Sequence, residues 1–393
     1  GATFTLASTD LIEARMSGIE KIVAAGVSNQ IISITVSDLV WEAGVTTIDL
    51  SADTNATGSN VIDVSNDDTG DNAWTLTGSA GIDTITGDSG VDTITGGAGA
   101  DVIDGGAGAD VIDGGAGADV IDGGAGEDVF VYVATADLVA SNALVDTLTG
   151  GSGTADAIAI NNNGGATFTL ASTDLIEARM SGIEKIVASG ATDQVISITV
   201  SDLVWEDGVT TIDLSADTNA TGSNVIDVSN DNTGTNAWTL TGSAGIDTIT
   251  GDSGADTITS GSGADAITGG DGIDTIILAS GANTISDLGV TGDADVVDLN
   301  GGTVIATTTG AWTATSATDN AGANAAAFTI NVASAGAVNL TSASTSAYGY
   351  TVVSTGTSAV TGSDDVDVLT NTSGDATMVG LAGADTFTAT AGA

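Results

Sequence analysis

The stretch "GGAGADVIDGGAGADVIDGGAGADVIDGGAGEDVF", from Gly96 to Phe130, writes nearly the same nine residues almost four times. The unit is G-G-x-G-x-D-x-U-x, where U is a large apolar residue, and repetition at a fixed short period is the signature of stacked, solenoid architectures. Traced outward, the run starts at Gly78. Its six units place an aspartate at one fixed position, giving Asp83, Asp92, Asp101, Asp110, Asp119 and Asp128. Four weaker units follow later and contribute Asp247, Asp256, Asp265 and Asp274.

Each unit predicts a six-residue turn followed by a three-residue strand. Glycine permits positive φ and lets backbone carbonyls crowd inward in the turn. Side chains alternate in the strand, so the isoleucine faces inward, while Asp104, Asp113 and Asp122 face outward. Two units make one coil, and coils stack at about 4.8 Å. We therefore predict an all-β parallel β-roll or β-solenoid with two aspartate ladders, one of Asp83, Asp101 and Asp119, and the other of Asp92, Asp110 and Asp128.

The charge of the chain makes these ladders an electrostatic problem. The 393 residues include 52 Asp and Glu against 4 Lys and Arg, a formal net charge of −48. Two carboxylates about 5 Å apart repel by roughly 0.8 kcal/mol even in water, so a divalent cation is needed between the turns. Calcium fits because it accepts six or more oxygen ligands in adaptable geometry, whereas magnesium demands a tight octahedron. An acidic solenoid without metal is the alternative.

The composition also excludes several functions. The chain has no His and no Cys, so zinc sites, thiol nucleophiles, disulfides and Ser-His-Asp triads are ruled out, and we expect no enzyme. A strongly negative field is a poor partner for nucleic acid or an anionic membrane surface. No run of about 18 apolar residues predicts a membrane span. With 41% hydrophobic residues, the chain is too apolar for a disordered acidic tail.

The unit GGAGADVID resembles the calcium-binding nonapeptide of the RTX family. The resemblance covers residues 78–131, then 242–277, and weakly 362–388, where Ala376 replaces the middle aspartate. It implies a β-roll, export in an unfolded state by a type I machinery, and folding outside the cell in millimolar calcium. Ser79 and Asp88 replace second glycines and Ser260 replaces a first one, which predicts weaker binding there.

The calcium ligands follow from this resemblance and from the carbonyls of the turns. The implied aspartates are Asp83, Asp92, Asp101, Asp110, Asp119, Asp128, Asp247, Asp256, Asp265 and Asp274, with Asp367 and Asp385 in the weak patch. The glycines predicted to contribute backbone carbonyls are Gly96, Gly99, Gly105, Gly108, Gly114, Gly117, Gly123 and Gly126.

A second period, of 164 residues, indicates an internal duplication. Residues 1–96 align on 165–260 without a gap and with 10 differences. Because Gly1 matches Gly165 inside the array, we expect the chain to be a piece of a longer array. The predicted organisation is an irregular solenoid (1–77), a first roll (78–131), a closing segment (132–164), a second irregular solenoid (165–241), a second roll (242–277), a closing and Ala/Thr/Ser-rich β region (278–361) and a weak RTX-like end (362–393).

The segments outside the nonapeptides predict strands and two short helices. Short apolar runs cut by Asn, Asp and Gly fit longer, irregular coils of the solenoid, and a sandwich is the alternative. Ser8–Ile22 and its copy Ser172–Ile186 each predict about two turns of helix, because Asp10 and Glu13 have capping-box spacing. All four basic residues lie in these two segments. They either dock on an acidic neighbour or form surface pairs, Lys21 with a nearby glutamate, Glu13 or Glu20.

Three functions compete on these grounds. The first is an extracellular bacterial structural protein, an S-layer or surface filament subunit that assembles with copies of itself and, as a further partner, with cell-surface polysaccharide. The second is a stalk section of a secreted adhesin. The third is the calcium-folding secretion domain of a secreted enzyme. The duplication and the low-complexity solenoid favour the first.

Overall fold

The structure is a computed structural model of the chain. It describes residues 3–6, 19–24, 31–37, 44–66, 72–140, 143–161, 167–170, 179–190, 194–201, 208–231, 236–288, 295–299, 303–308, 311–314, 318–320, 328–332, 337–343, 349–355, 358–372 and 376–390. The chain divides into a first unit (1–162, 173–187 and 206–209) and a second unit (163–172, 188–205 and 210–393). The finer division into seven segments stays a prediction.

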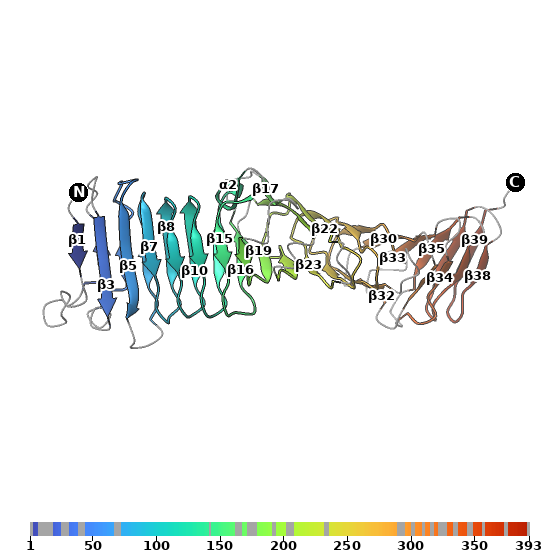
Figure 1. Cartoon of the computed structure of the whole chain (residues 1–393). Helices are drawn as coiled ribbons and strands as arrows, with labels where there is room; N and C mark the ends of the chain where they lie inside the picture. The colour runs from blue at the N-terminus through green and yellow to red at the C-terminus, as the bar shows by residue number, and fades with distance from the viewer. Residues whose placement is uncertain are drawn as a thin grey trace. The chain divides into compact units, whose positions relative to one another are not determined.

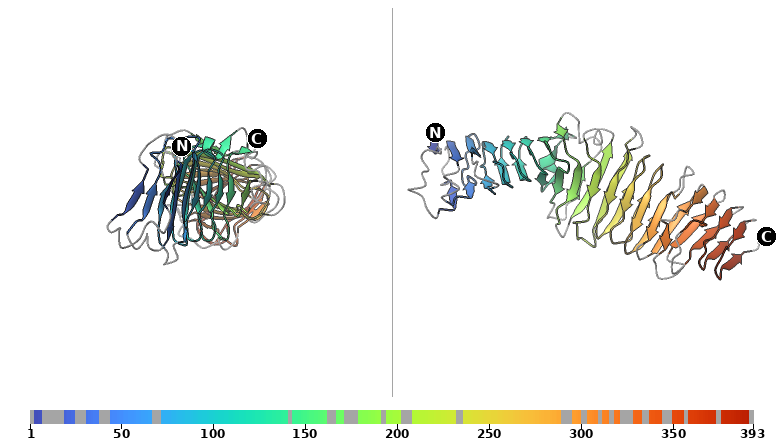
Figure 2. Two further views of the ribbon diagram at one scale, coloured as in Figure 1. Left: turned by 60° about the vertical axis from the view of Figure 1, so that its left-hand side comes forward. Right: turned by 90° about the horizontal axis from the view of Figure 1, so that it is seen from below.

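The first unit alternates between two parallel sheets, so that consecutive strands form successive coils (Figures 1 and 2). Sheet A contains β1 (Thr3–Leu6), β3 (Ile31–Ser37), β5 (Ser59–Asn66), β7 (Ile82–Thr86), β9 (Val102–Asp104), β11 (Val120–Asp122), β15 (Thr147–Thr149) and β18 (Met180–Ser181). Sheet B contains β2 (Lys21–Val23), β4 (Thr47–Asp49), β6 (Thr75–Thr77), β8 (Thr93–Ala98), β10 (Val111–Ala116), β12 (Val129–Tyr132), β16 (Ala157–Ile160) and β19 (Lys185–Ala188). The predicted parallel solenoid is confirmed, and the sandwich is not formed.

The register of the first roll follows the nine-residue unit. On sheet A, Ile85 pairs with Ile103 and Ile103 pairs with Ile121. Sheet B repeats this stacking: Ile94 pairs with Ile112, and Ile112 pairs with Phe130. These inward side chains are at most 1% exposed and form the core. Burial of an isoleucine contributes about 1.5–3 kcal/mol, so the stack is the main apolar source of stability.

The second unit is built in the same way from parallel strands. Sheet C contains β17 (Thr167–Leu170), β20 (Val195–Ser201), β22 (Ser223–Asn230), β24 (Ile246–Thr250), β26 (Ala266–Thr268), β28 (Ala282–Ile285), β30 (Thr303–Thr308), β33 (Phe328–Val332), β35 (Thr351–Ser354), β37 (Val368–Asn371) and β39 (Thr386–Ala389). Sheet D contains β21 (Thr211–Asp213), β23 (Thr239–Thr241), β25 (Thr257–Thr259), β27 (Thr275–Leu278), β29 (Val296–Leu299) and β32 (Asp319–Asn320). Sheet E contains β31 (Ala311–Thr313), β34 (Ala337–Asn339), β36 (Ala359–Thr361) and β38 (Thr377–Val379).

An insertion interrupts the first unit between β12 and β15. It consists of α2 (Thr135–Leu138), the one helix in the described ranges, and an antiparallel hairpin of β13 (Val139–Ala140) and β14 (Ala143–Leu144). Because of the insertion, aspartates on successive coils, Asp128 and Asp156, are 28 residues apart, whereas Asp110 and Asp128 are 18 apart.

The two predicted helices lie largely outside the described residues. The core of the first one, between Asp10 and Gly18, lies outside the described residues. In the copy, Met180 and Ser181 form β18, and Met180 pairs with Leu148 of β15. The pairing gives the backbone N–H and C=O groups of this segment partners in sheet A, which outweighs the local capping-box preference.

Candidate calcium sites

The predicted aspartates of the first roll lie on two ladders that are tied together by backbone hydrogen bonds. On the sheet A ladder, the N–H of Asp83 donates to Oδ1 of Asp101 and that of Asp101 to Oδ1 of Asp119, both at 2.8 Å. The sheet B ladder repeats the pattern from Asp92 to Asp110 at 2.7 Å and from Asp110 to Asp128 at 2.8 Å. Asp101, Asp119, Asp110 and Asp128 therefore each use one carboxylate oxygen to accept a backbone N–H of the preceding coil.

The second oxygen of the mid-ladder aspartates is buried without a hydrogen-bond partner. All of these side chains are at most 1% exposed. A buried polar atom without a partner costs roughly 1–3 kcal/mol, and more if it is charged. In the described part of the chain, the oxygen concerned is Oδ2 of Asp101, Asp110, Asp119, Asp128, Asp156, Asp265 and Asp274. We call these the open carboxylates.

Glycine carbonyls lie beside the open carboxylates. A Cβ added to Gly105 would lie 2.5 Å from the carbonyl oxygen of Gly123 on the next coil and 2.6 Å from Oδ2 of Asp110. Gly96 stands in the same relation to Gly114 and Asp101, again at 2.5 and 2.6 Å. Two hard oxygen donors from successive coils therefore converge beside these two first-position glycines. The predicted ligands fit calcium, which prefers carboxylate and carbonyl oxygens.

The fourth-position glycines line the same turns. Cβ atoms built on Gly99 and Gly117 would lie 3.2 and 3.0 Å from Oδ1 of Asp101 and Asp119, respectively. Among the described residues, no three acidic side chains gather at one point. A calcium ion in these turns would therefore take most of its oxygens from the backbone.

The ladders raise the pKa of their carboxyls. Burial is the largest cause, and the neighbouring carboxylates add to it. The pKa of Asp110 is raised to about 8 and that of Asp119 to about 7. The pKa of Asp101 and Asp128 is raised to about 6. Without a cation, ionisation of these groups is disfavoured relative to an exposed aspartate, because their charged form is desolvated and faces like charges.

A serine donates hydrogen bonds to the first ladder aspartate of the first roll, of the second roll and of the C-terminal patch. The N–H of Ser79 donates to Oδ2 of Asp83 at 2.6 Å, and its Oγ donates to the same oxygen at 2.9 Å. Ser243 and Ser363 make the same bonds to Asp247 and Asp367. We call this arrangement the serine latch. The latched aspartates were predicted as calcium ligands, a role that stays a prediction, but their carboxylates already have protein donors.

The second roll has shorter ladders than the first. The N–H of Asp247 donates to Oδ1 of Asp265 at 3.0 Å, and that of Asp256 to Oδ1 of Asp274 at 2.9 Å. Burial raises the pKa of Asp274 to about 8. In the weak C-terminal patch, Asp367 reaches Oδ1 of Asp385 at 3.1 Å.

Several ladder residues escaped the sequence prediction. Asp146 accepts the N–H of Asp119 at 2.8 Å, and Asp156 accepts that of Asp128 at 2.7 Å. Asn283 and Asp295 continue the ladders of the second unit. The glycines of "GGSG" at 150–153, followed by an aspartate one position late, were the available signal for Asp156.

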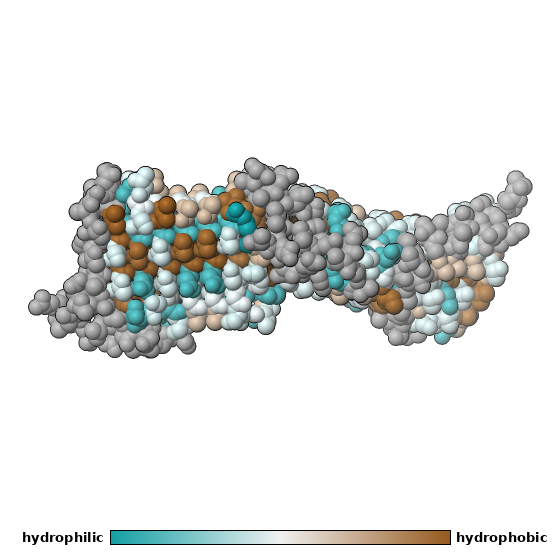
Figure 3. Space-filling view, viewed as in Figure 1, coloured by the Kyte–Doolittle hydropathy of each residue, from teal (hydrophilic) through white to brown (hydrophobic). Residues whose placement is uncertain are grey.

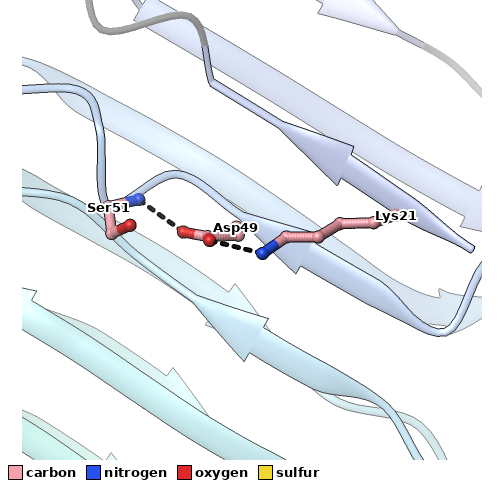
Figure 4. Close-up of polar contacts among 3 residues, drawn as sticks. All are labelled: Lys21, Asp49 and Ser51. Carbon is pink, nitrogen blue, oxygen red and sulfur yellow. Dashed lines mark hydrogen bonds and ion pairs between the residues drawn. The ribbon is translucent and has the colours of Figure 1, made fainter.

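Among the described basic residues, Lys21 is exposed on the first unit. Lys21 Nζ lies 2.7 Å from Oδ2 of Asp49, and the N–H of Ser51 donates to Oδ1 of the same carboxylate (Figure 4). The ion pair lowers the pKa of Asp49 to about 2. A surface pair was predicted for Lys21, with Glu13 or Glu20 as its partner. Its partner among the described residues is Asp49, which the pairing of β2 with β4 brings beside it, and Glu13 lies outside the described residues.

Comparison with known proteins agrees with this geometry. The model of the RTX calcium-binding nonapeptide repeat matches residues 75–103, 95–130, 241–276 and 370–393. The chain carries RTX calcium-binding repeats. Calcium is therefore the cation of these RTX turns, and all of the open carboxylates except Asp156 lie within the matched segments. No curated protein and no solved structure matches the chain. No helix in the described part of the chain has the length and apolar character of a membrane span.

Proposed function

We propose that the chain is a non-enzymatic structural protein of the bacterial cell surface, a subunit of an S-layer or filament that folds and assembles in calcium. The observation that carries the proposal is the periodicity of the outer faces. Val102 pairs with Val120 and Asp104 with Asp122 across adjacent coils of sheet A. Two successive coils of the roll thus present the same outward residues in register, as a repeating contact surface requires.

These outward rows combine apolar and acidic side chains. Val102 and Val120 are 47% and 50% exposed. Apolar and hydrophilic residues form neighbouring rows on the viewed face of the first unit (Figure 3). The valines would supply contact area between copies, and the aspartates would supply calcium ligands. At a formal charge of −48, copies repel one another unless a cation bridges them.

Weak calcium sites of this kind support an extracellular location. Extracellular calcium modules work with dissociation constants of about 10⁻⁴–10⁻³ M. Sites built from one or two carboxylates and backbone carbonyls belong in that range. Export in an unfolded state would then keep the ladders from folding before they reach calcium.

Assembly is tested by light scattering and electron microscopy while calcium is raised from micromolar to about 10 mM. We expect ordered sheets or fibres to appear above the concentration at which the chain folds. A variant with Asp104, Asp113 and Asp122 changed to Asn should fold at the parental calcium concentration but assemble only at higher calcium. A chain that folds and stays monomeric at high concentration would refute the array and favour an adhesin stalk.

A further inference from the structure

The turn at residues 150–156 lies beyond the last matched repeat of the first roll. It keeps the glycines of the unit at Gly150, Gly151 and Gly153 but has one extra residue before Asp156. Gly151 has φ +104°, like the second glycines of the matched units. The turn therefore has the backbone of a nonapeptide turn in a segment that the repeat pattern does not include.

Asp156 is an open carboxylate in this turn. Its side chain is 0% exposed, its Oδ1 accepts the N–H of Asp128 at 2.7 Å, and its Oδ2 has no hydrogen-bond partner. Cβ atoms built on Gly150 and Gly153 would lie 2.7 and 2.6 Å from that Oδ2. The Cβ on Gly150 would also press on the carbonyl oxygen of Gly182. The same pair of donors, a carboxylate oxygen and a carbonyl of the next coil, occurs beside the first glycines of the matched units.

A second carboxylate follows on the next coil. The N–H of Asp156 donates to Oε2 of Glu184 at 2.8 Å, just as the ladder aspartates donate to the next aspartate. In return, the N–H of Glu184 donates to the carbonyl of Asp156 at 3.0 Å. Glu184 thus takes the place of the next rung and adds a half-buried acidic group beside Asp156.

Asp146 also extends a ladder of the first unit, but its second carboxylate oxygen has a protein donor. Its Oδ2 accepts the hydroxyl of Tyr132 at 2.8 Å, so both of its oxygens have protein donors. Asp156 has no such donor among the described residues. A buried carboxylate oxygen without a hydrogen-bond donor, beside a second carboxylate and a backbone carbonyl, is energetically costly unless a cation binds there.

We propose that Asp156, Glu184 and the carbonyl of Gly182 form a calcium site outside the matched repeats. The ion would join the coil of residues 150–160 to the segment 180–184 and extend the roll past its insertion. The proposal rests on calcium binding by the chain and is independent of array formation.

The test counts calcium bound per chain, by equilibrium dialysis and atomic emission at roughly 1 mM free calcium. Asp156→Asn keeps the Oδ1 acceptor and the volume but removes the charge. We expect it to bind one calcium fewer than the parent. Glu20→Gln is the matched control, because Glu20 is the exposed counterpart of Glu184 in the other copy, and it should bind the parental number.

Parental calcium binding by an Asp156→Asn chain with the parental circular dichroism spectrum would overturn the proposal. If Asp156→Asn does not recover that spectrum, the calcium titration of Glu184→Gln tests the site instead. We expect Glu184→Gln to weaken one calcium by roughly tenfold. A calcium titration of Glu184→Gln that coincides with the parental one would overturn the site just as firmly.

Discussion

Protonation of the buried ladder aspartates at low pH should allow the chain to fold without calcium. In excess chelator, we predict that the chain gains β structure when the pH is lowered from 7 to 5. Burial raises the pKa of Asp110 to about 8, of Asp119 to about 7 and of Asp101 to about 6. A raised pKa in the folded state stabilises the fold below the ordinary value of 3.8, and this contribution is lost as the pH rises through the folded-state pKa.

The size of the effect follows from the number of protons taken up on folding. Each net proton changes the free energy of unfolding by about 1.4 kcal/mol per pH unit. Over two pH units, two net protons would add roughly 5 kcal/mol, which is comparable with the whole stability of a small domain. Protonation also removes the repulsion between adjacent rungs, roughly 0.9 kcal/mol per pair at 4.8 Å in water.

The assay is far-ultraviolet circular dichroism in chelator between pH 7.5 and 5. Asp110→Asn, which is neutral at every pH, should move the folding midpoint to higher pH, while the outward Asp104→Asn should not. The Lys21–Asp49 pair does not interfere, because its lowered pKa stabilises the fold above 3.8 and that contribution is lost only as the pH falls toward about 2. Loss of β structure between pH 7 and 5, or equal shifts in the two variants, would refute the reasoning.

Three further predictions follow from the turns. Asp101→Ala should weaken calcium affinity and the cooperativity of binding, and Asp104→Ala should not; equal losses in dialysis would mean that the strand register is wrong. Ser79→Ala should lower stability in calcium by about 1–2 kcal/mol in urea unfolding without changing the number of calcium ions bound. Gly106→Ala should destabilise more than Gly44→Ala, because both have positive φ, +101° and +96°, but only a Cβ on Gly106 would clash with a backbone carbonyl; equal urea midpoints for the two would contradict the stacking of the turns.

The sequence predicts the part of the fold that obeys a strict period. The spacing of Ile103 and Ile121 specifies the core, the register and the side of the coil on which each aspartate lies, because strand alternation has a period of two. Asp146 and Asp156 break the period, since an insertion with its own helix and hairpin separates them from the run. Their place became visible only through pairing of β15 and β16 with the strands of the preceding coil.

The serine latch shows a second limit of the sequence. Ser79 is visible as a departure from the repeat, and the prediction was weaker calcium binding. Its hydroxyl and N–H donate hydrogen bonds to the carboxylate of Asp83, four residues later. These bonds depend on the geometry of the folded turn, which the sequence does not specify. A similar limit applies at the end of the helix predicted within Ser172–Ile186. Met180 and Ser181 form a strand there, because pairing with β15 is a long-range contact that local propensity cannot anticipate.

The most direct test of the account is circular dichroism of the purified chain at pH 7.5 while calcium is raised from excess chelator to about 10 mM. The account predicts little β structure in chelator, a cooperative gain in calcium, and no comparable gain in magnesium. The same β content in chelator as in calcium would contradict the claim that the buried aspartate ladders need the ion to fold.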